Sequence, residues 1–134
     1  MTRFLGIDYG DVRIGIAVSD ALNMTAQPIG TLKNSKTVIN EIITIIETHK
    51  ITNLIIGLPK DQKGNDSKKA KDVRNFVDKL HQQININTEF VDERFSTVAV
   101  ERHLIGLNMS RKKRKEVIDT QAAMFILQGV LDRK

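Results

Sequence analysis

Alternating apolar and polar positions near the N-terminus predict two short strands joined by a tight turn. Residues 4–8 and 13–18 are rich in apolar and β-branched side chains, and residues 9–12 between them have the length and composition of a hairpin connection. A third strand is expected over residues 26–32. Together these segments predict an antiparallel meander at the start of the chain.

The rest of the chain alternates between helical and strand patterns. Apolar residues at helical spacing predict helices over residues 37–48 and 67–82, whereas the continuous apolar run over 53–58 is typical of a strand buried on both faces. The remaining elements are one strand and two helices, expected over residues 87–91, 97–107 and 111–131. Helices that alternate with strands after a meander predict a mixed α/β sheet covered by helices.

The composition is that of one ordinary globular domain over residues 1–134. Domains typically contain about 50–250 residues, so a chain of 134 residues does not hold two large lobes around a cleft. The chain contains no Cys, which excludes a disulfide scaffold, a thiolate metal cluster and cysteine catalysis. No apolar stretch approaches the roughly 18 residues of a membrane helix, and the N-terminus lacks an apolar signal core. We therefore expect a cytoplasmic protein without a membrane partner.

The charge distribution indicates a polyanionic partner. The net charge is +5, and five consecutive cations, Arg111 to Lys115, stand just before Asp119. Cations at the start of a helix oppose its dipole by about a few tenths of a kcal/mol each, so local stability does not explain the run, whereas a nucleic-acid backbone would. Solvated charge is the common alternative, and the basic loop 60–69 has the alternative of a plain flexible connection. The phosphate contacts are expected from Lys112, Lys113, Arg114 and Lys115.

Two acidic residues stand where a purely structural carboxylate would be costly. Asp8 ends the first predicted strand, and a carboxylate buried there needs a cation or hydrogen-bond donors. Turn formation explains Asp8 equally well. Asp119 precedes Ala122 and Ala123 at helical spacing, which predicts that it faces the sheet. The alternative is a surface ion pair with Lys115, worth at most about 1 kcal/mol.

A third acidic position lies at the end of the last predicted strand. Alternation sends Asp92 and Glu93 to opposite faces, so at most one of them enters a shared site while the other is solvated or paired with Arg94. The pattern does not choose between the two. A cluster of one of these acids with Asp8 and Asp119 contains only oxygen ligands, which suits Mg²⁺ or Mn²⁺. Two such ions about 3.5–4 Å apart support phosphodiester hydrolysis.

Four short motifs cover nearly the whole chain in order. They are Gly6-Ile7-Asp8-Tyr9-Gly10 with Arg13-Ile14-Gly15-Ile16-Ala17-Val18-Ser19-Asp20, Ile56-Gly57-Leu58-Pro59 with Gly64, Val91-Asp92-Glu93-Arg94 with Ser96-Thr97, and Asp119-Thr120-Gln121-Ala122-Ala123 with Ile126-Leu127. In this order they resemble the YqgF/RuvX-type family. Its members are described both as Holliday junction resolvases and as pre-16S rRNA processing nucleases, with an RNase H-like fold.

The resemblance implies an RNase H-like mixed sheet, with a three-stranded antiparallel meander and parallel strands flanked by helices. It also implies that Asp8, Asp119 and one acid of the Asp92-Glu93 pair, preferably Glu93, bind Mg²⁺ or Mn²⁺. Arg13 and Arg94 belong to motifs around this site and are expected to contact substrate. The implied activity is a metal-dependent endonuclease on structured nucleic acid.

The implied substrates are structured RNA and branched DNA. We favour processing of the 5′ end of pre-16S rRNA in ribosome biogenesis over Holliday junction resolution in DNA recombination. Resolution requires paired cuts, so that activity would imply a homodimer on the junction. Aromatic residues make up only 4% of the chain, which favours recognition of backbone and shape over base stacking.

Two other classes of function remain as alternatives. The protein could be a non-catalytic module that binds RNA or the transcription machinery, with a vestigial acidic set. It could also be a phosphotransferase of the actin and sugar-kinase type, because Asp8-Tyr9-Gly10 resembles the first phosphate loop of those enzymes. The second lobe and the adenosine-binding segment of such kinases do not fit within 134 residues, so this alternative ranks last.

Overall fold

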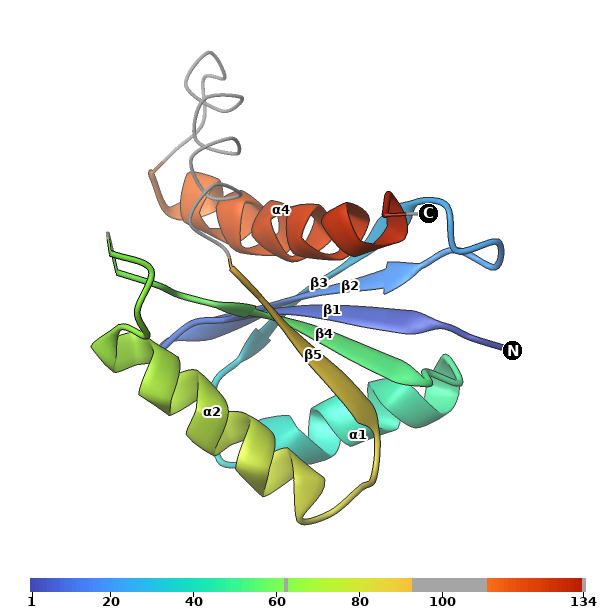
Figure 1. Cartoon of the computed structure of the whole chain (residues 1–134), viewed down its shortest axis with the longest axis horizontal. Helices are drawn as coiled ribbons and strands as arrows, with labels where there is room; N and C mark the ends of the chain where they lie inside the picture. Colours follow the sequence, from blue (N-terminus) through green and yellow to red (C-terminus); the bar gives the residue numbers. More distant parts are fainter. Residues whose placement is uncertain (62, 93–110, 134) are drawn as a thin grey trace.

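A five-stranded mixed sheet forms the centre of the structure (Figure 1). The computed structural model describes residues 1–61, 63–92 and 111–133, with side chains from residue 118 onward in the last segment. The strands are β1 (Phe4–Tyr9), β2 (Arg13–Ser19), β3 (Ala26–Lys33), β4 (Asn53–Leu58) and β5 (Asn87–Asp92), in the spatial order β3-β2-β1-β4-β5. The first three are antiparallel, and β4 and β5 run parallel to β1.

Helices cover both faces of the sheet. Helices α1 (Val38–Thr48) and α2 (Lys68–His81) lie on one face, and the long helix α4 (Arg111–Leu131) lies on the other (Figure 1). Each strand and helix predicted within the described ranges is confirmed, with ends that agree to within one residue. The short helix predicted over 97–107 lies outside the described residues. No helix in the described part of the chain is long and apolar enough to cross a bilayer.

Strand β1 directs alternate side chains into two separate cores. Leu5 and Ile7 are fully buried in the core beneath α1 and α2. Phe4 packs on the other core, beneath α4, and Gly6 contacts α4 directly. Because side chains alternate along a strand, Asp8 lies on the α4 face of the sheet. The alternation of side chains along β1 therefore places the Asp8 carboxylate on the side of the sheet covered by α4.

Small residues let α4 lie unusually close to the sheet. Ala122 and Ala123 are buried in the contact. A Cβ atom added to Gly6 would lie 2.8 Å from Leu127 Cβ and 2.9 Å from the carbonyl oxygen of Ala123. The helix backbone thus rests almost on the strand backbone, as the alanine pair predicts. The basic run, residues 111–115, forms the first turns of α4. It therefore lies on the same side of the sheet as Asp8.

Candidate active site

The candidate active site lies at the carboxyl end of β1, where this strand meets β2 and α4. Asp8 is half-buried one residue before the end of β1, and its partner in the antiparallel ladder is Gly15. Directly paired residues in such a ladder project to the same face. Gly15 therefore leaves an open position beside Asp8 on the face that α4 covers.

The backbone of α4 fills the position that Gly15 leaves open. A Cβ atom at Gly15 would lie only 2.0 Å from the carbonyl oxygen of Asp119. This close approach places Asp119 over the strand pair that carries Asp8, although 111 positions separate the two acids along the chain. The structure thus brings two of the sequence-predicted acids to one place, from a strand and from the helix above it.

Arg13 joins β2 to α4 through an ion pair. Its Nε donates a hydrogen bond of 3.0 Å to Asp119 Oδ2, and the two side chains are 22% and 27% exposed. This contact confirms that Asp119 faces the sheet. The side chain of Lys115, the alternative partner, lies outside the described residues. The sequence predicts Arg13 near the site as a substrate contact. Its ion pair with the Asp119 carboxylate is a contact that sequence spacing does not indicate.

The end of β5 shows the direction of one of the two acids that strand alternation alone does not distinguish. Phe90 packs on the α1 and α2 core, whereas Val91 packs on the α4 core. Alternation therefore directs Asp92, which is exposed and paired in register with Leu58, toward the α1 and α2 face. That face is opposite to the face of Asp8. Glu93 and Arg94 lie outside the described residues, so their predicted roles stay predictions.

The donor chemistry of this region fits a hard divalent cation. Asp8 and Asp119 supply carboxylate oxygens, which Mg²⁺ and Mn²⁺ prefer as ligands. Within the described residues no group of three or more His, Cys, Asp or Glu side chains could by itself hold a metal ion. The predicted third ligand, Glu93, falls outside those residues. Lys112, Lys113, Arg114 and Lys115 lie in the first turns of α4, where only the backbone is described.

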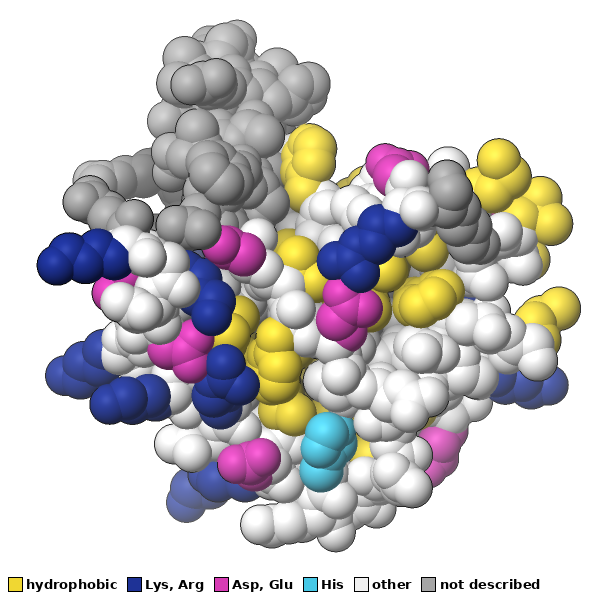
Figure 2. Space-filling model, viewed as in Figure 1, with side chains coloured by type: hydrophobic (Ala, Val, Ile, Leu, Met, Phe, Trp, Pro, Cys, Tyr) yellow, Lys and Arg dark blue, Asp and Glu magenta, His cyan; other side chains and the backbone are white. Residues whose placement is uncertain are grey.

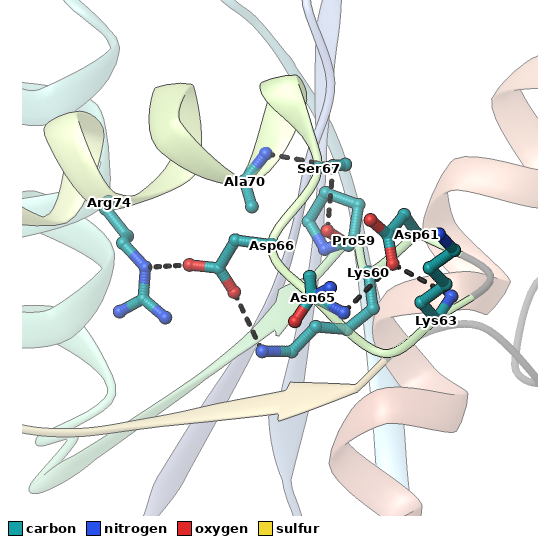
Figure 3. Close-up of polar contacts among 9 residues, drawn as sticks. All are labelled: Pro59, Lys60, Asp61, Lys63, Asn65, Asp66, Ser67, Ala70 and Arg74. Atoms are coloured by element: carbon teal, nitrogen blue, oxygen red, sulfur yellow. Dashed lines mark hydrogen bonds and ion pairs between the residues drawn. The ribbon is translucent and has the colours of Figure 1, made fainter.

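The loop between β4 and α2 is held by its own acidic residues (Figure 3). Asp66 accepts hydrogen bonds from Arg74 Nε at 2.7 Å and from Lys60 Nζ at 2.8 Å. Asp61 Oδ1 accepts from the backbone amides of Lys63 and Asn65, both at 2.9 Å. The described residues of this segment therefore form a hydrogen-bonded turn. The Asp61 turn chemistry could have been found in the sequence, whereas the Arg74 contact could not.

Ion pairing leaves only part of this loop's charge for a ligand. Lys60 is committed to Asp66, and Ser67 caps α2 by accepting a hydrogen bond from the amide of Ala70 at 3.2 Å. Lys63 and Lys68 stay exposed. Figure 2 shows Lys and Arg side chains gathered on the side of the molecule where α2 begins. This surface adjoins the carboxyl ends of the parallel strands, where Asp8 lies.

The stability that Asp66 provides is expected to depend on pH. The hydrogen bond from Arg74, followed by that from Lys60, lowers the pKa of Asp66 from 3.8 to about 2. A lowered pKa in the folded state contributes stability that is complete above the unfolded value and is lost as the pH falls through the folded value. We expect the melting temperature of the wild type to exceed that of Asp66→Asn above about pH 4 and the difference to close toward pH 2. Thermal unfolding followed by circular dichroism measures this, and a constant difference would contradict it.

Comparisons with known proteins show the family to which the chain belongs. The family model described as "RuvX: Holliday junction resolvase" matches residues 2–133. A Myxococcus xanthus protein is 42% identical over 132 residues, covering 97% of this chain and 87% of its own length. A Clostridioides difficile protein is 43% identical over 134 residues, covering 98% and 95%. Both carry the name "Putative pre-16S rRNA nuclease".

Solved structures confirm the fold class. Thermus thermophilus RuvC in complex with a Holliday junction substrate has a TM-score of 0.59 at 12% identity, and the match covers 98% of this chain and 94% of that one. A Fowlpox virus resolvase in complex with Holliday junction DNA has a TM-score of 0.57 at 13% identity, with 98% and 97% covered. At these identities the likeness shows the RNase H-like mixed sheet alone.

Proposed function

Because the chain belongs to the RuvX family, we propose that it is a divalent-metal-dependent endonuclease that processes the 5′ end of pre-16S rRNA. The observation that carries the proposal is the position of Asp119 over Gly15, the ladder partner of Asp8, on the face covered by α4. The name shared by the relatives supports the choice of RNA substrate. The proposed role belongs to ribosome biogenesis in the cytoplasm.

The acidic residues are proposed to form one ligand set. Asp8, Asp119 and Glu93 would hold the divalent ions, and Asp92 is the less favoured member of its pair because it faces the other side of the sheet. Bound Mg²⁺ or Mn²⁺ would activate water and neutralise charge at the scissile phosphate. Arg13 fixes the direction of the Asp119 carboxylate through the bond to Oδ2. Its guanidinium also keeps positive charge beside the site.

Substrate contacts are proposed for two groups of cations. Arg13 and Arg94 would contact the phosphates nearest the cut. The basic run would bind more distant phosphates, because it precedes Asp119 in the same helix. These contacts are expected from Lys112, Lys113, Arg114 and Lys115.

A direct cleavage comparison tests the proposal. The full-length protein is incubated with a pre-16S rRNA fragment, a four-way DNA junction and linear duplex DNA, each in Mg²⁺, in Mn²⁺ and in EDTA. We expect cleavage of the RNA fragment in the metal-containing buffers and none in EDTA. Salt-sensitive binding of the RNA without turnover in any buffer would instead favour a non-catalytic binding module.

Holliday junction resolution is the second candidate, because the family description and both structural neighbours name it. Resolution needs two symmetric cuts and hence two subunits on one junction. Sedimentation of the protein with and without the junction measures this stoichiometry. Cleavage of the junction but not of the RNA, by a complex containing two subunits, would replace our first choice by the second.

A further inference from the structure

A cavity of about 450 Å³ lies on the sheet face opposite the candidate active site. It opens between α2 and the connection from β3 to α1, next to the carboxyl end of β1. Its size falls within the roughly 300–1,000 Å³ that is usual for small-ligand sites. Six of its lining residues supply aromatic, amide and cationic groups, namely Tyr9, Phe76, Asn34, Asn75, Lys36 and Lys79.

The cavity combines the three kinds of group that bind a nucleotide. Tyr9 and Phe76 form an aromatic pair with ring centroids 4.8 Å apart, and Phe76 anchors it in the core at 6% exposure. Asn34 is held by a hydrogen bond of 2.9 Å from its Nδ2 to the carbonyl oxygen of Gly10, so its amide has a fixed direction. Asn75 adds an exposed amide on α2. Aromatic faces stack bases and amides bind base edges in RNA complexes.

The charge of the lining favours a phosphate-bearing ligand. Lys36 and Lys79 are exposed at the cavity, and Asp72 is the anion beside them, so the cations are in excess by two to one. Among the described residues neither lysine forms an ion pair. Both ammonium groups are thus available to a phosphate, in contrast to Lys60, which Asp66 holds.

The position of Tyr9 connects the cavity to the proposed catalytic site. Tyr9 directly follows Asp8, and consecutive Cα atoms are about 3.8 Å apart. The two side chains project to opposite faces of the sheet at the end of β1. A nucleic-acid strand bound at Asp8 could therefore pass over this end of the sheet, so that its next nucleotide reaches the other face.

We propose that this cavity binds an unpaired nucleotide of the substrate strand, adjacent to the scissile phosphate. The base stacks on Tyr9, the amides of Asn34 and Asn75 contact its edge, and Lys36 and Lys79 bind its phosphate. The inference rests on the proposed nuclease function for the identity of the strand. It gives the enzyme a means of selecting single-stranded flanks of the substrate.

The single tyrosine of the chain provides a direct probe. Protein labelled with ¹³C in the tyrosine ring gives signals from Tyr9 alone, and EDTA prevents cleavage during a titration. We expect an RNA duplex with a single-stranded overhang to shift these signals saturably. A blunt duplex should not shift them, and a mononucleotide should bind at least about tenfold more weakly than the overhang. The absence of a shift with the overhang, or equal affinity for the mononucleotide, would overturn the proposal.

A matched pair of lysine variants on α2 completes the test. Lys79→Ala removes a cation from the cavity, whereas Lys71→Ala removes an exposed cation that does not line it. We expect Lys79→Ala and Asn75→Ala each to weaken overhang binding about fivefold or more, and Lys71→Ala to stay within about twofold of the wild type. Equal effects of Lys79→Ala and Lys71→Ala would reject the cavity.

The two proposals can fail separately. Cleavage of precursor RNA by the wild type, with no Tyr9 shift by the overhang, would reject the cavity and leave the nuclease function standing. A Tyr9 shift without cleavage in Mg²⁺ or Mn²⁺ would support the nucleotide site and reject the nuclease function.

Discussion

Asp8→Asn is expected to lower metal-dependent cleavage of precursor RNA at least about 100-fold while the protein stays folded. A metal ion contributes several kcal/mol of transition-state stabilisation, and each factor of ten in rate corresponds to about 1.4 kcal/mol. The amide keeps the shape of the carboxylate but removes the charge that a hard cation requires. Single-turnover cleavage rates in Mg²⁺ and in Mn²⁺ measure the effect.

Asp119→Asn is expected to act in the same way, because its amide oxygen can still accept the hydrogen bond from Arg13 Nε. Binding of Mn²⁺, followed by electron paramagnetic resonance, should weaken in both variants and thus gives a readout apart from cleavage. Asp78→Asn is the matched control, since this exposed acid lies on α2, on the other side of the sheet. Wild-type cleavage by either site variant, with an intact circular dichroism spectrum, would remove that residue from the metal site.

Local sequence patterns predict the elements of this fold because each pattern reflects a periodicity of burial. The continuous apolar run of β4 is buried from Leu54 to Leu58, as expected for a strand between two layers. The spacing of Asp119 from Ala122 and Ala123 likewise predicts its direction, since a helix fixes which residues share a face. The sequence alone therefore predicts the fold class, the order of the elements and the direction of Asp119.

Contacts between residues far apart in the sequence cannot be predicted from such local patterns. Arg13 meets Asp119 across 106 positions, and this pairing depends on where α4 crosses the sheet rather than on any local pattern. The Arg74 contact with Asp66 depends similarly on the path of the β4–α2 loop. Strand alternation predicts that Asp92 and Glu93 point to opposite faces of the sheet, but it does not say which of them points to which face. The packing of Phe90 and Val91 supplies that face.

Gly15→Ala is expected to destabilise the protein by about 3 kcal/mol or more, since overpacking usually costs about 1–3 kcal/mol and the obstacle here is backbone. The added Cβ would lie 2.0 Å from the Asp119 carbonyl oxygen, so α4 must move away from β2 as a unit. For a domain of this size the loss corresponds to a fall in melting temperature of roughly 10 °C. Thermal and urea unfolding measure it.

The same displacement should also reduce cleavage at temperatures where the variant is fully folded. Gly15 sits between Asp8 and Asp119, and a shift of about 1 Å in reacting groups can cost a factor of about 100 in rate. Gly129→Ala is the matched control, because a Cβ there meets nothing within 4 Å, and alanine in a helix is favoured over glycine by about 0.5–1 kcal/mol. We therefore expect opposite effects on stability from one added methyl group on β2 and one on α4. A fully stable and active Gly15→Ala protein would mean that α4 does not hold Asp119 against β2.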